Sequence, residues 1–332
     1  MKKILLAIVV FPCICSAQYT YKNLEVNFLE KPNESSGYTY GNLRIYPVRA
    51  KESFKKEFAG VGNYVTLKEA IGKNKIKIKE SGDGGTVNNL VIENISKDTI
   101  IIITGDVIKG GKQDRIVSED IVLSPSSGKK TLPVYCVESG RWSSNQNNAG
   151  VSTRNNATVS DNKSAAEFNG YYNKGSVSLR KVVEKEKDQS KVWSKVDELN
   201  SANKTETSTK TYTAMTQSAD FTKKLDQYIL FFKNKFEKDS SVVGVVVVTS
   251  NKVIGCDMFA THDLFVKQFE SLLHSYATEA IVTGKPVNIA TTTVKSYTDK
   301  LLANESVQKE TLKEKGNSFS EKGKKLRVSA FD

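Results

Sequence analysis

The sequence predicts an α+β fold, in which an antiparallel β-sheet N-terminal region precedes a helix-rich C-terminal region containing a β-hairpin. Three observations support this prediction. Short apolar segments follow one another closely in the first half, which is typical of antiparallel sheet and not of βαβ units. Apolar stripes with helical spacing dominate the second half. Among these stripes, the apolar segments 242–249 and 252–258 are joined by Ser250 and Asn251, which predicts the hairpin.

The N-terminal region contains one helix and several strands. Residues 43–48 alternate between apolar and polar and predict a strand, with Pro47 favouring an edge position. Residues 66–71 predict a short helix. Five further strands are expected at 75–80, 87–95, 99–108, 115–123 and 130–137.

The composition changes in the segment 143–176, which is rich in asparagine, serine and glycine. Such a segment cannot bury enough apolar surface to offset the entropy lost on ordering. We therefore expect a mobile loop, which is either a lid over a site or an inert spacer.

Helices are expected in most of the remaining chain. One is predicted to begin near Leu179 and to carry Val192, Trp193, Val196 and Leu199 on one face. Two more contain the apolar stripes 221–236 and 265–280, the latter capped by Thr261 or Asp263. A last helix is expected at 289–304 and a closing strand at 326–331.

The first 17 residues have the pattern of a secretory signal peptide. Lys2 and Lys3 precede an unbroken apolar run from 4 to 11, and Ala17 ends a segment of small residues. We expect cleavage near Ala17 and hence a secreted or periplasmic protein. Residues 18–37 are predicted to form an extended arm and 38–332 a single α+β domain.

Composition excludes several classes of protein. The chain has 332 residues, 49 Lys and Arg against 37 Asp and Glu, 38% apolar residues and a mean hydropathy of −0.40. These values exclude a polytopic membrane protein, a collagen-like fibre and a fully disordered chain. The lysines are not interleaved with aromatic residues, so we expect no nucleic-acid partner. No stable membrane insertion, metal or cofactor is predicted, and the sequence names no protein partner.

The first candidate binding motif is the segment from Gly110 to Arg115. Two adjacent glycines between strands let successive backbone amides point the same way and hold an anion. Lys112 and Arg115 supply charges that suit a phosphate or carboxylate. The alternative is a Gly-Gly hairpin turn with solvated charges. The candidate ligand-binding residues are Gly110, Gly111, Lys112, Gln113, Asp114 and Arg115.

The second motif runs from Leu132 to Trp142. On a strand that ends near Glu138, the side chains of Cys136 and Glu138 face the same side, about 7 Å apart. Glu138 is the candidate acid or base, Arg141 an anion clamp and Trp142 a stacking surface for a ligand. The alternatives are that Glu138 and Arg141 pair within the fold and that Trp142 covers the core.

The two cysteines that follow the signal segment, Cys136 and Cys256, allow two interpretations. After export they can form a disulfide, if their geometry permits it. Otherwise they remain thiols, and Cys136 is more often a small buried residue than a nucleophile. No histidine is placed by the sequence to activate the thiol, which disfavours nucleophilic catalysis by Cys136.

Together the two motifs resemble the ARG and Rhodanese-Phosphatase-superfamily-associated protein domain family, where ARG stands for ADP-ribosylglycohydrolase. The similarity rests on the segments Gly110-Gly111-Lys112-Gln113-Asp114-Arg115 and 132–142. Weaker support comes from residues 40–43, 67–70 and 243–257. The family name records an association with enzymes of ADP-ribose and phosphate metabolism, so the resemblance implies an ADP-ribose-like or phosphate-ester ligand.

Two hypotheses about function follow from the sequence. In the first, the chain is an exported domain that binds a small anionic ligand at the two motifs. If this domain is an enzyme, it hydrolyses that ligand. In the second, it is a non-catalytic cell-envelope interaction or structural protein, whose motifs serve only the fold. The hypotheses differ in geometry, because the second expects Glu138 and Arg141 to pair with each other and Lys112 to point to solvent.

Overall fold

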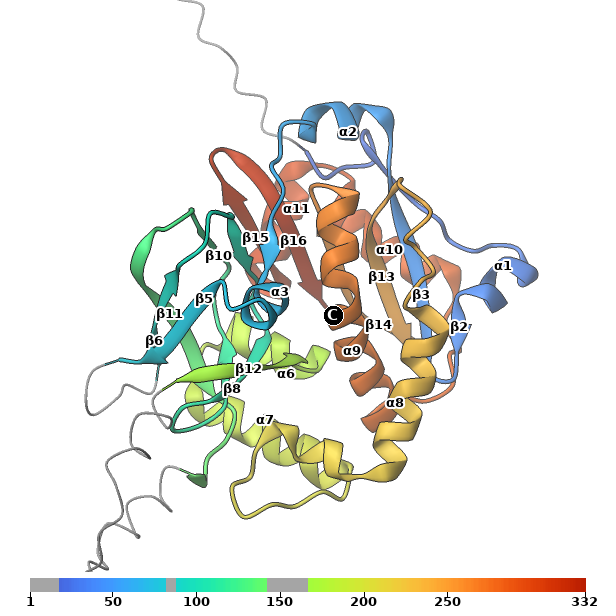
Figure 1. The fold of residues 1–332 in the computed structure, drawn as a ribbon. Coiled ribbons are helices and arrows are strands. Elements are labelled where there is room, and N and C mark those ends of the chain that lie inside the picture. Colours follow the sequence, from blue (N-terminus) through green and yellow to red (C-terminus); the bar gives the residue numbers. More distant parts are fainter. Residues whose placement is uncertain (1–17, 82–87, 142–166) are drawn as a thin grey trace, which may run out of the picture.

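The computed structural model describes residues 18–81, 88–141 and 167–332 (Figure 1). It confirms the α+β class, with three sheets and helices concentrated in the C-terminal half. The predicted signal segment 1–17 and Trp142 lie outside the described residues, as does most of the predicted loop.

The largest sheet has seven strands in the order β1-β3-β13-β14-β16-β15, with β2 paired to β3. The hairpin of β13 (Val242–Thr249) and β14 (Lys252–Phe259) is confirmed, and it lies at the centre of this sheet. Both hairpin strands are almost wholly buried, because helices cover both sheet faces. The other strands are β1 (Leu24–Val26), β2 (Thr39–Tyr40), β3 (Leu43–Ala50), β15 (Gly316–Glu321) and β16 (Lys324–Phe331).

The helices of the C-terminal half enclose the seven-stranded sheet. Helix α9 (His262–Val282) crosses one face, where Tyr276 donates a hydrogen bond to Asp257 of β14 at 2.7 Å. Its N-cap is Thr261, as predicted. Helix α8 (Ala219–Phe232) packs against α9. Helix α10 (Thr291–Leu302) contacts β14, and α11 (Glu305–Lys315) contacts β15 and β16.

A six-stranded sheet forms the second lobe, in the order β12-β8-β9-β11-β6-β5. Its edge strands nearly meet, because Lys79 forms a bridge with Glu167 and an ion pair at 2.7 Å, so the sheet curls toward a barrel. The strands are β5 (Ile76–Glu80), β6 (Asn89–Asn94), β8 (Asp106–Gly110), β9 (Arg115–Val117), β11 (Gly128–Cys136) and β12 (Phe168–Lys174).

Three short strands and one helix pack onto this lobe: β4 (Val65–Thr66), β7 (Ile100–Ile102), β10 (Ile121–Leu123) and α3 (Leu67–Gly72). Helix α3 is the predicted one and begins with a capping box, in which Thr66 and Glu69 bond each other's backbone amides. The apolar core of this lobe is separate from the core around the seven-stranded sheet. The chain thus has two hydrophobic cores.

Several expectations are wrong in detail. The predicted strands 99–108 and 115–123 each divide into two, because the chain turns at Gly105 and again between Val117 and Ile121. The end of the predicted loop forms β12, which pairs with β8. Its aromatic residues Phe168 and Tyr171 supply the apolar contacts that the asparagine-rich composition concealed.

The predicted arm at 18–37 is also partly ordered structure. Tyr19 and Leu24 are completely buried, β1 pairs with β3, and α1 (Pro32–Gly37) follows. Strand β3 is interior, against the expectation from Pro47. The strand tolerates proline because this residue faces the gap between β1 and β2, where its carbonyl accepts from Asn27 and no amide donor is needed.

The helix expected from Leu179 is interrupted. Helix α6 (Val177–Lys181) continues as a π-helical turn, η1 (Val182–Glu186), and ends at Lys187, whose φ is 50°. Helix α7 (Gln189–Ala202) then buries Val192, Val196 and Leu199 as predicted. A 3₁₀ segment, η2 (Tyr212–Gln217), leads into α8. Single π turns inside helices are frequent at functional sites.

Candidate functional site

The two sequence motifs lie side by side in the structure. The amide of Val137 donates to the carbonyl of Asp114 at 3.0 Å, and the amide of Asp114 donates to the carboxylate of Glu138 at 3.0 Å. Nη2 of Arg141 reaches back to the carbonyl of Gly110 at 3.1 Å. The β8–β9 turn and the end of β11 therefore form one unit, which we call the motif junction (residues 110–115 and 136–141).

Gly110 and Gly111 form the turn between β8 and β9, with φ angles of 127° and 55°. A Cβ atom on Gly111 would lie 2.3 Å from the ring of Phe168 and 2.8 Å from Oε1 of Glu80. The glycines thus serve close packing of the turn against β12 and β5. Close packing is therefore a sufficient reason for the two adjacent glycines, and no bound anion is needed to explain them.

Replacing Gly111 with alanine is therefore expected to lower the free energy of unfolding by about 2–5 kcal/mol, from the left-handed backbone and the clash together. Gly128→Ala is the matched control, because Gly128 also has a positive φ, 69°, but nothing lies within 4 Å of its added Cβ. Its cost is expected to stay at about 1–2 kcal/mol. Urea denaturation measures both values, and equal losses would show that packing against Phe168 is unimportant.

Arg115 points into the protein. Its side chain is completely buried, Nη1 donates to the carbonyl of Gln113 at 2.6 Å, and Nη2 lies 3.5 Å from Oε1 of Glu80. The guanidinium also lies 5.8 Å from the ring centre of Phe168. Glu80, whose part in the junction the sequence reasoning missed, also accepts the amide of Lys112 at 2.8 Å. This buried position differs from the expectation that Arg115 holds a phosphate or carboxylate ligand.

Glu138 and Arg141 form an ion pair at 2.8 Å. The same guanidinium nitrogen lies 3.1 Å from Asp114, whose other carboxylate oxygen accepts the hydroxyl of Thr211 at 3.1 Å. Glu138 is 4% exposed, and the side chain of Arg141 is 33% exposed. Glu138, the candidate acid or base, is therefore buried and paired with Arg141, the candidate anion clamp.

Cys136 and Cys256 are both buried, and no disulfide joins them. Burial raises the pKa of Cys136 to about 11, and the nearby guanidinium of Arg115 lowers it too little to compensate. Burial also raises the pKa of Cys256 well above its ordinary value. The two thiols are therefore protonated at neutral pH, and only the thiolate is a good nucleophile.

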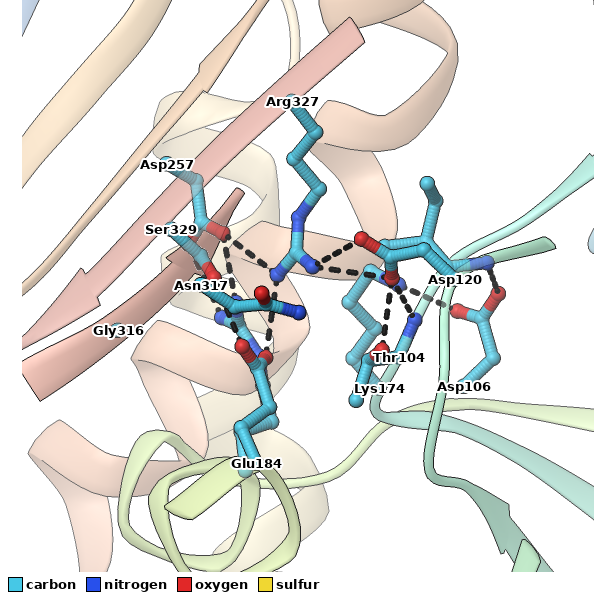
Figure 2. A network of polar contacts seen from close by, with 12 residues as sticks. Thr104, Asp106, Asp120, Lys174, Glu184, Asp257, Gly316, Asn317, Arg327 and Ser329 are labelled. Carbon is cyan, nitrogen blue, oxygen red and sulfur yellow. Dashed lines mark hydrogen bonds and ion pairs between the residues drawn. The ribbon is translucent and has the colours of Figure 1, made fainter. Parts of the chain in front are cut away.

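A second polar cluster, which the sequence analysis missed, lies between the two lobes (Figure 2). Its centre is Arg327 of β16, which is 1% exposed and pairs with Asp120 at 2.9 Å, Glu184 at 3.2 Å and Asp257 at 3.2 Å. Asp120 belongs to the smaller lobe, Glu184 to the π turn and Asp257 to the large sheet. We call this group, with the residues that pair with it below, the interlobe network.

Two further buried cations extend the interlobe network. Arg180 of α6 pairs with Asp257 at 2.6 Å, and Lys174 of β12 pairs with Asp106 at 2.6 Å. Burial alone raises the pKa of Asp257, but Arg180 and Arg327 more than offset this effect and hold the pKa at about 2. Isolated charges inside apolar strands, such as Asp257 in β14, were the available sequence signal for these pairs.

Residues 33–330 match the family model of the ARG and Rhodanese-Phosphatase-superfamily-associated Protein domain. The chain belongs to this family. The match spans both lobes, the motif junction and the interlobe network of this ARG and Rhodanese-Phosphatase-superfamily-associated domain, and it confirms the resemblance seen in the two motifs. No curated protein and no solved structure matches the chain.

Two further observations concern the described part of this domain. None of its helices is both long and apolar enough to span a membrane. Its only histidines, His262 and His274, lie on α9 and do not converge. His262 bonds the carbonyls of Val242 and Glu237, and His274 packs edge-on against Tyr172 at 5.3 Å.

Proposed function

We propose that this chain is an exported domain that binds a small anionic ligand and does not transform it. The observation that carries the non-catalytic part is the pairing of Glu138 with Arg141 at 2.8 Å inside the motif junction. A general acid or base must reach the proton that it moves. A carboxylate that is 4% exposed, and that already accepts an amide and a guanidinium, is poorly placed for that role.

The anionic character of the ligand is supported by the charge of the chain, which has 49 Lys and Arg against 37 Asp and Glu. Such an excess favours association with anions. Export through the segment 1–17 is part of the same proposal, and N-terminal sequencing of protein collected outside the cytoplasm tests it. A new N-terminus at Gln18 is the expected result.

A second candidate function is binding, or hydrolysis, of an ADP-ribose-like or phosphate-ester ligand at the motif junction itself. One observation favours it. Nε of Arg115 and Oε2 of Glu80 are buried and have no hydrogen-bond partner within the described chain. Unsatisfied buried groups of this kind are places where a water or a ligand supplies the missing bond.

Glu138→Gln distinguishes the two functions. If the junction serves the fold, the variant loses about 1–3 kcal/mol of unfolding free energy, because the charged partner of Arg141 is removed. Wild-type protein is then expected to release no product from ADP-ribosyl or phosphate-ester substrates. Turnover by the wild type that disappears in a folded Glu138→Gln protein would contradict the proposal and support the second candidate.

Ligand binding is tested by a thermal-shift screen with ADP-ribose, nucleotides and phosphorylated sugars. We expect at least one of these anions to raise the melting temperature, because a ligand that binds only the native state stabilises it. The screen is repeated on Arg115→Ala and Glu138→Ala. A shift that survives in both variants places the ligand away from the motif junction.

A further inference from the structure

A basic cleft lies where α11 packs against β15, β16 and the π turn η1. Its volume is about 450 Å³, within the range of small-molecule sites. Four of the described residues that line it are lysines, Lys185, Lys309, Lys313 and Lys325, and Glu305 is the acidic one among them. The lining side chains therefore carry a formal excess of three positive charges.

Lys185 is held in place by backbone carbonyls. Its ammonium group donates to the carbonyls of Leu312 at 3.2 Å, Lys313 at 2.6 Å and Gly316 at 3.1 Å, at the C-terminal end of α11. This is the favourable position for a cation on a helix. The neighbouring residue in η1, Glu184, belongs to the interlobe network and lies near Gly316 and Asn317 at the start of β15 (Figure 2).

Lys325 is held by a buried amide. Its side chain is 15% exposed, its ammonium donates to Oε1 of Gln308 at 3.0 Å, and the carboxylate of Glu305 is 3.9 Å away. Gln308 is 1% exposed and donates to the carbonyls of Tyr19 and Leu301, which fixes its orientation. Burial lowers the pKa of Lys325, and Glu305 opposes this only in part. A bound anion would add a second negative charge beside this ammonium group, together with Glu305.

The other two lysines are exposed and adaptable. Lys309 makes no ion pair within the described residues, and Lys313 pairs with Glu310 at 2.7 Å, where both side chains are more than half exposed. Such exposed pairs contribute little stability and are easily exchanged. Ser318 also lines this cleft.

We propose that this basic cleft binds the phosphate-ester or pyrophosphate group of a small molecule. Lys185 and Lys325 supply fixed positive charges, and Lys309 and Lys313 close onto the anion from the solvent side. The inference rests on the proposed binding function and names its ligand class and its site. The cleft beside α10 is the weaker alternative, because its Lys315 is paired with Asp332 at 3.0 Å and only Lys300 adds a further positive charge to its lining.

Titration calorimetry with sodium pyrophosphate and with ADP, at about 150 mM NaCl, tests the assignment. The double variant Lys309→Gln/Lys325→Gln is compared with Lys233→Gln/Lys238→Gln, which removes the same charge from an exposed segment after α8. We expect affinity about tenfold or more weaker in the first variant, since charge-assisted hydrogen bonds are lost, and little change in the second. Equal weakening in both variants would show a non-specific charge effect and overturn the proposal.

Lys309→Gln alone serves as the variant that leaves the fold intact, because Lys309 is exposed and bonds no described side chain. Its affinity is expected to fall by a factor of about three to ten. Pyrophosphate binding that persists in the Lys309→Gln and double variants but disappears in Arg141→Gln would overturn the assignment of the site to the basic cleft. The proposed function of anion binding would still hold. Hydrolysis of phosphate esters by wild type, with binding still lost in the lysine variants, would overturn only the non-catalytic function.

Vesicles containing phosphatidylglycerol test whether the ligand is a lipid, because a lipid headgroup presents the same phosphate chemistry. We expect pyrophosphate to bind free protein without vesicles. Co-sedimentation with vesicles that pyrophosphate does not compete away, together with no calorimetric signal for either soluble anion, would overturn the assignment to a small molecule.

Discussion

Replacing Arg327 with methionine is expected to lower the free energy of unfolding by about 3–5 kcal/mol, because three buried carboxylates lose their shared cation. Asp120, Glu184 and Asp257 come from three different parts of the chain, so the loss also weakens the contact between the lobes. Urea denaturation followed by circular dichroism measures the effect. Typical domains have only about 5–15 kcal/mol of stability, so the urea midpoint of the variant is expected to be much lower than that of the wild type.

Arg49→Met is the matched control for Arg327→Met. Arg49 pairs with Asp239 at 3.1 Å on the surface, where the two side chains are 28% and 39% exposed. Solvent screens such a pair, so its loss is expected to cost less than about 1 kcal/mol. If both variants lose the same small amount of stability, the interlobe network does not hold the lobes together.

The stability of the protein is expected to fall by about 3 kcal/mol between pH 6.5 and pH 4, and His274 is the cause. Burial, aided by the charge of Lys68, lowers the pKa of His274 from its ordinary value of 6.5 to about 4. In this range the unfolded chain binds a proton that the folded protein does not. Stability from this group is therefore complete above pH 6.5 and is lost as the pH falls toward 4.

His274→Phe keeps an aromatic ring against Tyr172 and is expected to remove most of this pH dependence. Wild-type protein titrated under the same conditions is the reference. Urea titrations at several pH values provide the measurement. A further decline below about pH 4 is expected in every variant, because Asp257 keeps its charge down to a pKa of about 2. An unchanged slope in His274→Phe would assign the effect to another group.

Much of the fold could be predicted because periodicity reports local burial. The apolar stripe of α8, the hairpin of β13 and β14 and the short helix α3 each depend on residues close in sequence. Strand divisions were missed at Gly105, where an apolar run conceals a turn. Strand β12 was missed because its ordering depends on pairing with β8, about 60 residues earlier in the chain, and not on its own composition.

The candidate site also has a part that local sequence predicts and a part that depends on residues distant in the chain. A shared ligand site requires the two motifs to be neighbours, and hydrogen bonds between Asp114 and the end of β11 do bring them together. The direction of Arg115 was not predictable, because its partner Glu80 lies on a separate strand. The interlobe network was missed because each charge in it, such as Asp257, is isolated in an apolar segment and finds its partner only in three dimensions.

The meeting of β5 and β12 at Lys79 and Glu167 has a consequence for self-association. The edge strands of an open sheet have unpaired backbone amides and carbonyls. These groups can pair with a strand of another molecule, which leads to aggregation. Here the two edge strands lie next to each other and are joined by an ion pair. Few unpaired backbone amides and carbonyls therefore remain accessible. The smaller lobe is thereby protected from adding strands of another copy.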